Sequence, residues 1–317
     1  MTIFEAKSMS LPCRDHRSRL QLAIAALLLL LFVDCHRAEN GPETKIWEQF
    51  SGDNAFAHVQ QLVDFGPRPP GSEALEKARV YIERQLRQAG WTVERQEFAD
   101  ETPRGLVRFA NLIARWQAPG KTRPSFLLSS HYDTKLFEAF RFVGANDAGS
   151  STGLLLEMAH VLGRYPDLAA KVELVFFDGE EAFETFSETD GLYGSRYFAK
   201  QLGLEKAKQF RGGILFDMVG DRDLTITLPP DSPVPIARDI FASADALGMR
   251  KHFTYFDAEI TDDHTPLNEI GIPTIDVIDF DYPPWHTSED TLDKLSPESL
   301  RTVGSVALYY LANYALK

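Results

Sequence analysis

Several apolar segments of this 317-residue chain end in side chains that can bind a metal ion or transfer a proton. These side chains are His131, Asp133, Glu180, Glu181, Asp217 and His286, and Asp147 precedes a further apolar segment. Carboxylates and imidazoles form a nitrogen and oxygen ligand set that suits zinc. A zinc site of this kind with an open coordination position is typical of catalysis.

The cysteine content excludes the other common kinds of site. Only Cys13 and Cys35 are present, and both lie in the first 35 residues. The rest of the chain therefore has no disulfide, no thiolate zinc site and no cysteine nucleophile.

The pair Glu180-Glu181 is the most informative of these motifs. It follows four consecutive apolar residues, 174–177 in the expected strand 172–177, and a glycine turn, where a solvated charged surface is not expected. Adjacent carboxylates at a turn point in different directions, so one can bind a metal while its neighbour acts as a base. Each motif alone is weak evidence, but their joint position at strand ends favours a metal site.

Alternating apolar patterns predict the elements that position these residues. Strands are expected at 91–98, 106–116, 126–130, 172–177, 213–219, 224–228 and 272–278. Helices are expected at 43–65, 72–90, 151–162, 192–202, 236–247 and 296–315, the last with Ser296 as its N-cap, and a turn at 119–124. This alternation predicts an α/β sandwich with a largely parallel sheet, in which ligands collect at the carboxyl ends of the strands.

The N-terminal segment resembles an export signal. Three arginines precede the apolar run 22–33, which is shorter than the roughly 20 residues of a membrane span. We expect residues 1–38 to be a signal peptide or a membrane anchor, with a lipid on Cys35 as one form of attachment. Residues 39–317 are expected to form a single catalytic domain that is exported to the periplasm or secreted.

The net charge of −13 excludes several partners. Nucleic-acid binding and polybasic attachment to anionic lipid both need a basic surface. We therefore expect no nucleic-acid partner, and contact with a membrane only through the N-terminal segment.

Six motifs together resemble the animal-type (type II) glutaminyl-peptide cyclotransferases, which share a fold with bacterial zinc aminopeptidases. The motifs are His131-Tyr-Asp-Thr-Lys135, Gly144-Ala-Asn-Asp147, Phe176-Phe-Asp-Gly-Glu-Glu-Ala-Phe183, Leu192-Tyr-Gly-Ser-Arg196, Asp262-Asp-His-Thr-Pro266 and Trp285-His-Thr287. They occur in the family's order over roughly residues 45–315. The resemblance implies a bacterial member of that family and a three-layer α/β/α sandwich around a mixed, largely parallel sheet.

The resemblance also implies roles for individual residues. One zinc is held by Asp147, Glu181 and His286, and it acts as a Lewis acid on the side-chain carbonyl of an N-terminal glutamine. Glu180 shuttles the proton as the glutamine closes to pyroglutamate and releases ammonia. The expected substrates are peptides or proteins with N-terminal glutamine, and the enzyme is expected to be a monomer.

Four further residues have implied roles around the zinc and the substrate. Asp217 and Asp262 are expected to form a hydrogen-bonded acidic pair beneath Glu180. Trp285 packs beside the substrate, and Phe186 stands where the animal enzymes have a tryptophan.

The alternative is a zinc aminopeptidase with two metal ions. In such aminopeptidases the residues that match His131 and Asp217 bind the second zinc, and the one that matches Asp147 bridges the two ions. All three residues are present in this chain. Asp262 favours the cyclase, because aminopeptidases usually carry a small residue at that position, and so does Trp285 directly before His286. A degenerate metal-binding receptor module and a peptide-binding protein are the non-enzyme alternatives.

Overall fold

A computed structural model describes residues 45–117 and 123–317 of the chain. The predicted export segment, Cys35 and most of the predicted turn at 119–124 lie outside these residues. The boundary at residue 38 therefore stays a prediction. Among the described residues no helix is both long and apolar enough to cross a bilayer.

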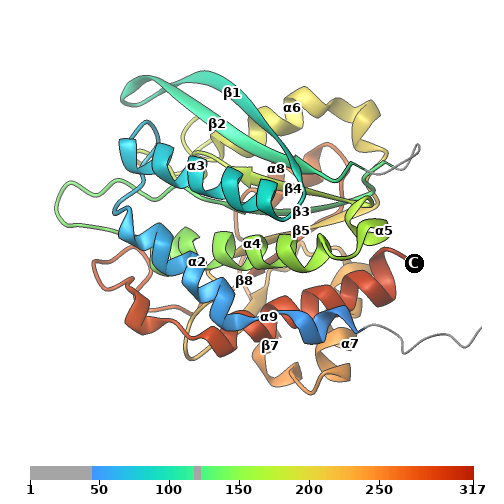
Figure 1. Cartoon of the computed structure of the whole chain (residues 1–317). Coiled ribbons are helices and arrows are strands. Elements are labelled where there is room, and N and C mark those ends of the chain that lie inside the picture. The colour runs from blue at the N-terminus through green and yellow to red at the C-terminus, as the bar shows by residue number, and fades with distance from the viewer. Residues whose placement is uncertain (1–44, 118–122) are drawn as a thin grey trace, which may run out of the picture. The chain divides into compact units, whose positions relative to one another are not determined.

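A six-stranded sheet forms the centre of the fold, in the order β1-β2-β4-β3-β5-β8 (Figure 1). Its strands are β1 Thr92–Thr102, β2 Gly105–Arg115, β3 Phe126–His131, β4 Val172–Phe177, β5 Gly212–Asp217 and β8 Thr274–Ile278. β1, β2 and β4 pair antiparallel, whereas β4, β3, β5 and β8 run parallel. The parallel strands are buried on both faces, which explains why apolar residues dominate them without alternation.

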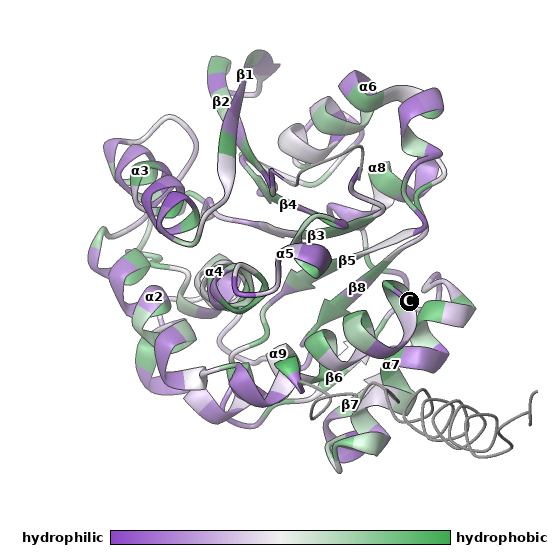
Figure 2. Ribbon diagram, turned by 45° about the vertical axis from the view of Figure 1, so that its right-hand side comes forward, coloured by the Kyte–Doolittle hydropathy of each residue, from purple (hydrophilic) through white to green (hydrophobic). Residues whose placement is uncertain are grey.

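One face of the sheet is covered by a group of long helices (Figures 1 and 2). They are α2 Gly52–Asp64, α3 Glu73–Gln88, α4 Ser151–Leu162, α7 Val234–Ala246 and α9 Pro297–Tyr310. The largest hydrophobic core lies under this layer and includes Leu128, Phe176 and Phe216 from the sheet. Serine side chains cap three of these helices by accepting a backbone N–H: Ser51, Ser72 and, as predicted, Ser296.

The opposite face is covered by α6 Tyr193–Ala207 and α8 His264–Glu269. A second core lies there and joins Leu127, Val175 and Phe177 of the sheet to Phe198 and Leu267 of the helices. Apolar side chains on both faces of the sheet thus confirm the predicted three-layer sandwich with a mixed, largely parallel sheet.

Several elements differ from the predicted ones. The single helix expected at 43–65 is divided into the 3-10 turn Ile46–Gln49 and α2, because Phe50 and Ser51 are extended. The short elements α5 Pro166–Ala169, β7 Phe253–Tyr255 and α8 were not predicted; β7 pairs with β6 Ile226–Leu228 in a separate ribbon. Short elements bury few residues, so they leave little periodicity in the sequence.

The connections place the carboxyl ends of β3, β4 and β5 together. The chain passes from β3 through α4 to β4, and then through α6 on the other face to β5, which lies on the far side of β3. The strand order therefore reverses at β3. In open α/β sheets this reversal point opens the crevice that binds ligands.

Gly153 allows α4 to pack closely against α2. A Cβ atom there would lie 2.7 Å from the backbone oxygen of Ala55 and 2.7 Å from a methyl carbon of Val59. We predict that Gly153→Ala lowers the free energy of unfolding by about 1–3 kcal/mol, since overpacking outweighs the gain in helix propensity. Chemical denaturation measures this change. The control is Lys200→Ala on the exposed side of α6, and equal stability of the two variants would contradict the prediction.

Candidate active site

The carboxyl ends of the three central strands carry the predicted site residues. His131 is the last residue of β3, Asp217 is the last residue of β5, and Glu180 and Glu181 follow β4 after the turn at Gly179. All four side chains are buried. The parallel sheet therefore brings together groups that lie up to 86 residues apart in the sequence.

Asp147 and His286 reach the same point from two long connections. Asp147 lies in the irregular turn Ala145–Ser150 that precedes α4. His286 lies in the loop between β8 and α9 and has φ of +55°, a left-handed conformation that is uncommon for a residue other than glycine. His286 Nε2 lies 3.3 Å from Asp147 Oδ2 and 3.2 Å from Glu181 Oε1.

Within residues 45–117 and 123–317, two groups of three side chains could hold a metal ion. In one, Asp147, Glu181 and His286 each offer a ligand atom, and these atoms lie within 4.8 Å of one another; in the other, His131, Asp147 and Asp217 do so. His131 Nε2 lies 3.3 Å from Asp147 Oδ1 and 3.2 Å from Asp217 Oδ1. The structure thus assembles both the predicted ligand set and the second set of the two-metal alternative, with Asp147 in common.

The first group fits a divalent cation such as zinc. Glu181 Oε2 is buried and accepts no hydrogen bond from the described residues. Lys135 Nζ lies 3.6 Å from it, too far for a hydrogen bond. A buried carboxylate oxygen without a hydrogen-bond donor is costly, and a bound cation would satisfy it. The nitrogen and oxygen ligands agree with the zinc preference.

Glu180 lies beside the ligand groups without belonging to either. Its carboxylate is 3.9 Å from His131 Nδ1. Burial raises the pKa of Glu180 well above its usual range; nearby Asp262 raises it further, and His131 opposes the shift. Glu180 is therefore a buried carboxyl that can hold a proton next to the candidate metal ligands.

The predicted hydrogen bond between Asp217 and Asp262 is not formed in the structure. Asp217 contacts His131 instead, and Asp262 Oδ1 accepts the backbone N–H of Asp263. Burial, and next the charge of Asp217, raise the pKa of Asp262 to about 6. The two carboxyl groups are close enough to interact electrostatically, but the imidazole of His131 is the better partner for an ionised Asp217.

Trp285 and Phe186 lie at the mouth of a cavity of about 200 Å³ that these groups line. Trp285 is 40% exposed and stacks on His286, with ring centroids 4.2 Å apart, and it also contacts Phe280. Phe186 is 37% exposed. Both predicted aromatic residues therefore form the walls of the cavity that leads to the ligand groups.

Three residues support the site in ways that the sequence did not predict. Asp133 accepts the backbone N–H groups of Glu180 and Glu181. Asp290 accepts the N–H of Asn146 at 2.8 Å, the N–H of Asp147 at 3.2 Å and the hydroxyl of Tyr282 at 2.9 Å.

Arg68 is the third of these residues and is completely buried. Its guanidinium donates to five backbone carbonyl groups. They belong to Leu62, Gly66, Tyr132, Val143 and Gly144. Arg68 thereby fixes the chain directly before Asp147. Nothing in its surroundings in the sequence, Gly-Pro-Arg-Pro-Pro, indicates this role.

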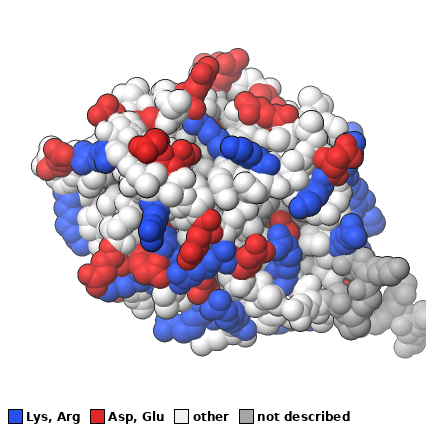
Figure 3. Space-filling view, turned by 90° about the horizontal axis from the view of Figure 1, so that it is seen from above, with Lys and Arg blue, Asp and Glu red and all other residues white. Residues whose placement is uncertain are grey.

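Charged residues of both signs are interspersed on the face of the molecule shown in Figure 3. This face has no continuous basic patch of the kind that nucleic-acid binding requires. The lack of a basic patch on this face agrees with the acidic net charge of −13.

Comparisons with known proteins connect this geometry to a family. The family described as Peptidase family M28 matches residues 111–311. The glutaminyl-peptide cyclotransferase-like protein of Bos taurus is 31% identical over 281 residues, which cover 78% of this chain and 72% of the bovine protein.

The solved structures that resemble this chain include both cyclases and peptidases. Glutaminyl cyclase from an Acidobacteriales bacterium is 33% identical with a TM-score of 0.76, covering 83% of this chain and 94% of that one. A Zn-dependent exopeptidase from Parabacteroides distasonis is 27% identical with a TM-score of 0.74, covering 83% of this chain and 98% of that one.

Asp290 should control metal affinity through the backbone of Asp147. The two carboxylate oxygens of Asp290 accept the backbone N–H groups of Asn146 and Asp147. Asp290→Asn replaces one of these oxygens with an amide NH2, which cannot accept a hydrogen bond. We expect zinc affinity, measured by competition with a chelator, to fall about 10- to 100-fold. Asp293→Asn changes an exposed carboxylate three residues away and serves as the control. Equal affinity of the two variants would show that the contact does not position the ligand.

Proposed function

Because this chain belongs to peptidase family M28 and, within it, to the glutaminyl-peptide cyclotransferases, we propose that it converts the N-terminal glutamine of peptides to pyroglutamate and releases ammonia. The pairing of buried Glu180 with a second buried carboxyl, Asp262, in a small aromatic-walled cavity is the observation that carries this function. An intramolecular cyclisation needs a proton carrier at the reacting atoms and little space beyond the glutamine itself.

We assign the metal site to Asp147, Glu181 and His286, with one zinc ion. Zinc bound there would polarise the side-chain carbonyl of the glutamine as a Lewis acid. His131 contacts Asp147 from the other side and is itself in contact with Asp217. In the aminopeptidase alternative these two residues would instead bind a second ion.

Glu180 is proposed to carry the proton through the reaction. The α-amino nitrogen attacks the side-chain carbonyl carbon, and Glu180 accepts a proton from that nitrogen. When the bond from this carbon to the amide nitrogen breaks, Glu180 returns the proton and ammonia leaves. One carboxyl group therefore serves first as base and then as acid, and the overall reaction takes up no water.

Asp262 is proposed to act on Glu180, and the aromatic residues on the substrate. The charge of Asp262 favours the protonated form of Glu180, which returns the proton to the leaving group. Trp285 and Phe186 offer apolar surfaces to the methylene groups of glutamine. Trp285 is also stacked on His286, so it helps to orient that ligand.

Export of the enzyme through the N-terminal segment and a monomeric state are part of the same proposal. A protein with N-terminal glutamine would then meet the enzyme outside the cytoplasm. The family resemblance supports this location, and the apolar run 22–33 after three arginines supports the export signal.

Glu180→Gln separates catalysis from binding. The amide keeps the size and burial of the side chain but cannot accept the proton, so we expect kcat to fall about 10²- to 10⁴-fold. Ammonia release from a peptide with N-terminal glutamine measures this effect, and zinc content reports on the metal site. Glu184→Gln, in the exposed part of the same loop, is the control. Retention of kcat in Glu180→Gln would refute the assignment.

The choice between cyclase and aminopeptidase requires both substrates in one assay. We expect loss of ammonia from a glutaminyl peptide, seen by mass spectrometry without hydrolysis, and no release of p-nitroaniline from leucyl p-nitroanilide. Metal analysis of the purified protein should give about one zinc per chain. Cleavage of the leucyl substrate together with about two zinc ions would favour the aminopeptidase.

A further inference from the structure

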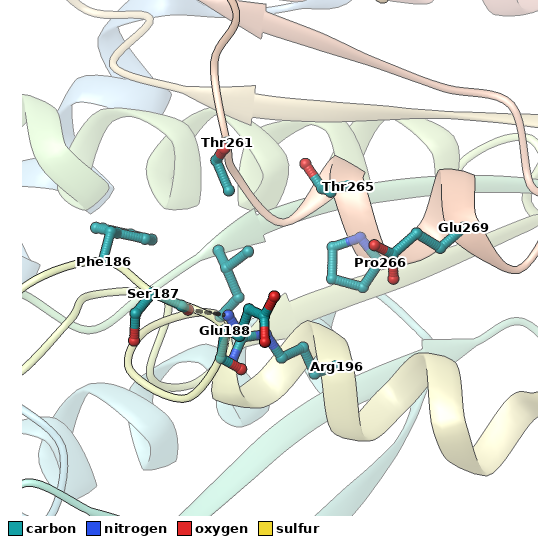
Figure 4. Close-up of a pocket in the computed structure, with 9 residues that line it drawn as sticks. Phe186, Ser187, Glu188, Arg196, Thr261, Thr265, Pro266 and Glu269 are labelled. Carbon is teal, nitrogen blue, oxygen red and sulfur yellow. Dashed lines mark hydrogen bonds between the residues drawn. The ribbon is translucent and has the colours of Figure 1, made fainter.

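A second hollow, of about 570 Å³, lies beside the cavity that contains Glu180. Phe186 and Thr261 line both spaces, so the two are adjacent at these residues. Figure 4 shows this outer hollow between the loop 186–188 on one side and α8 on the other. No part of the reaction described above uses it.

The size of the inner cavity requires such a space. At about 200 Å³ it lies below the roughly 300–1,000 Å³ of typical small-molecule sites, so it has room for the N-terminal residue and little more. The rest of a peptide must leave through the mouth. An extended chain advances about 3.4 Å per residue, so the next few residues of the peptide come to lie directly outside it.

The outer hollow carries acidic side chains on opposite walls. Glu188 belongs to the loop and Glu269 to the end of α8, and both are exposed. In Figure 4 the carboxylate of Glu269 points from α8 back toward the loop that carries Glu188. Two exposed carboxylates across a hollow attract a cationic side chain placed between them.

Arg196 is the basic residue in the wall, but its guanidinium is already engaged. Its Nη1 donates to the backbone oxygen of Glu188 at 2.5 Å, and its Nη2 donates to that of Ser187 at 2.6 Å. Arg196 therefore fixes the loop in its observed path. Because Arg196 binds these carbonyl groups rather than a carboxylate, Glu188 and Glu269 stay available to a ligand.

We propose that the outer hollow binds the residues that follow the N-terminal glutamine of the substrate, and that Glu188 and Glu269 select substrates with lysine or arginine at these positions. This inference rests on the proposed cyclase function and names the substrate class for it. The binding is electrostatic and solvent-exposed, so it adjusts the preference among glutaminyl peptides rather than deciding whether they react.

A peptide series tests this preference. Glutaminyl hexapeptides carry lysine, norleucine or glutamate at the second, third or fourth position, and kcat/KM is measured from ammonia release. We expect lysine to exceed norleucine by about threefold to tenfold at one or more positions, as one or two exposed ion pairs allow. Glutamate should fall below norleucine. The ratio of lysine to norleucine should decrease with added salt.

Variants assign the effect to the outer hollow. In Glu188→Gln, Glu269→Gln and the double variant, the ratio of lysine to norleucine should fall toward one, whereas Glu184→Gln, which removes a charge from the same loop outside the hollow, should keep it. A ratio near one in the unsubstituted enzyme, or a ratio that survives the double variant, overturns the inference while the cyclase activity stands. Absence of ammonia release from every glutaminyl peptide overturns the proposed function and this inference with it.

Discussion

The repulsion among buried carboxylates is the constraint on which the rest of the structure depends. Asp147, Glu180, Glu181, Asp217 and Asp262 are all buried in one region at the carboxyl ends of the central strands. Removing an ionised carboxylate from water is costly, and each neighbour of the same sign adds to the cost. A fold that collects these groups must supply compensating donors, cations or protons.

Three buried residues around these carboxylates hold the turns in place, and one of them also adds a positive charge. Asp133 and Asp290 are themselves acidic, yet each accepts backbone N–H groups, which ties the turns that carry Glu180 and Asp147 to fixed points. Arg68 adds a buried positive charge and holds the carbonyl groups before Asp147. Arg68 therefore combines charge compensation with positioning, whereas Asp133 and Asp290 position the turns, and together these hydrogen bonds fix the site.

Bound protons and a metal ion would neutralise the remaining negative charge of the buried carboxylates. Burial and neighbouring charge raise the pKa of both Glu180 and Asp262, so each of these two carboxyl groups can retain a proton. The proposed ligands Asp147 and Glu181 instead have His286 between them, and Glu181 keeps an oxygen without a donor among the described residues. We therefore propose that Glu180 and Asp262 balance their charge with protons, and that Asp147 and Glu181 balance theirs with a cation.

The sequence predicts the parts of this arrangement that leave a pattern. Apolar runs reveal β3, β4 and β5, and the polar residues at their ends are predicted to converge because parallel strands share one edge. Contacts that depend on a single residue were missed: Asp290 lies in a polar loop, and Arg68 stands between prolines without any periodicity. The predicted hydrogen bond between Asp217 and Asp262 is not formed, and spacing cannot show that His131, from another strand, reaches Asp217 instead.

The ligand groups alone do not determine the reaction of this fold. Both possible metal groups are formed here, and the solved structures that resemble this chain include glutaminyl cyclases and a zinc-dependent exopeptidase. A hydrolase must admit water to the reacting carbon, whereas a cyclisation is protected when water is excluded. Trp285 and Phe186 narrow the mouth of the inner cavity, and Asp262 favours a proton on Glu180. We therefore propose that the difference between the two reactions lies in the surroundings of Glu180 and in the space left beside it, rather than in the residues that could hold a metal.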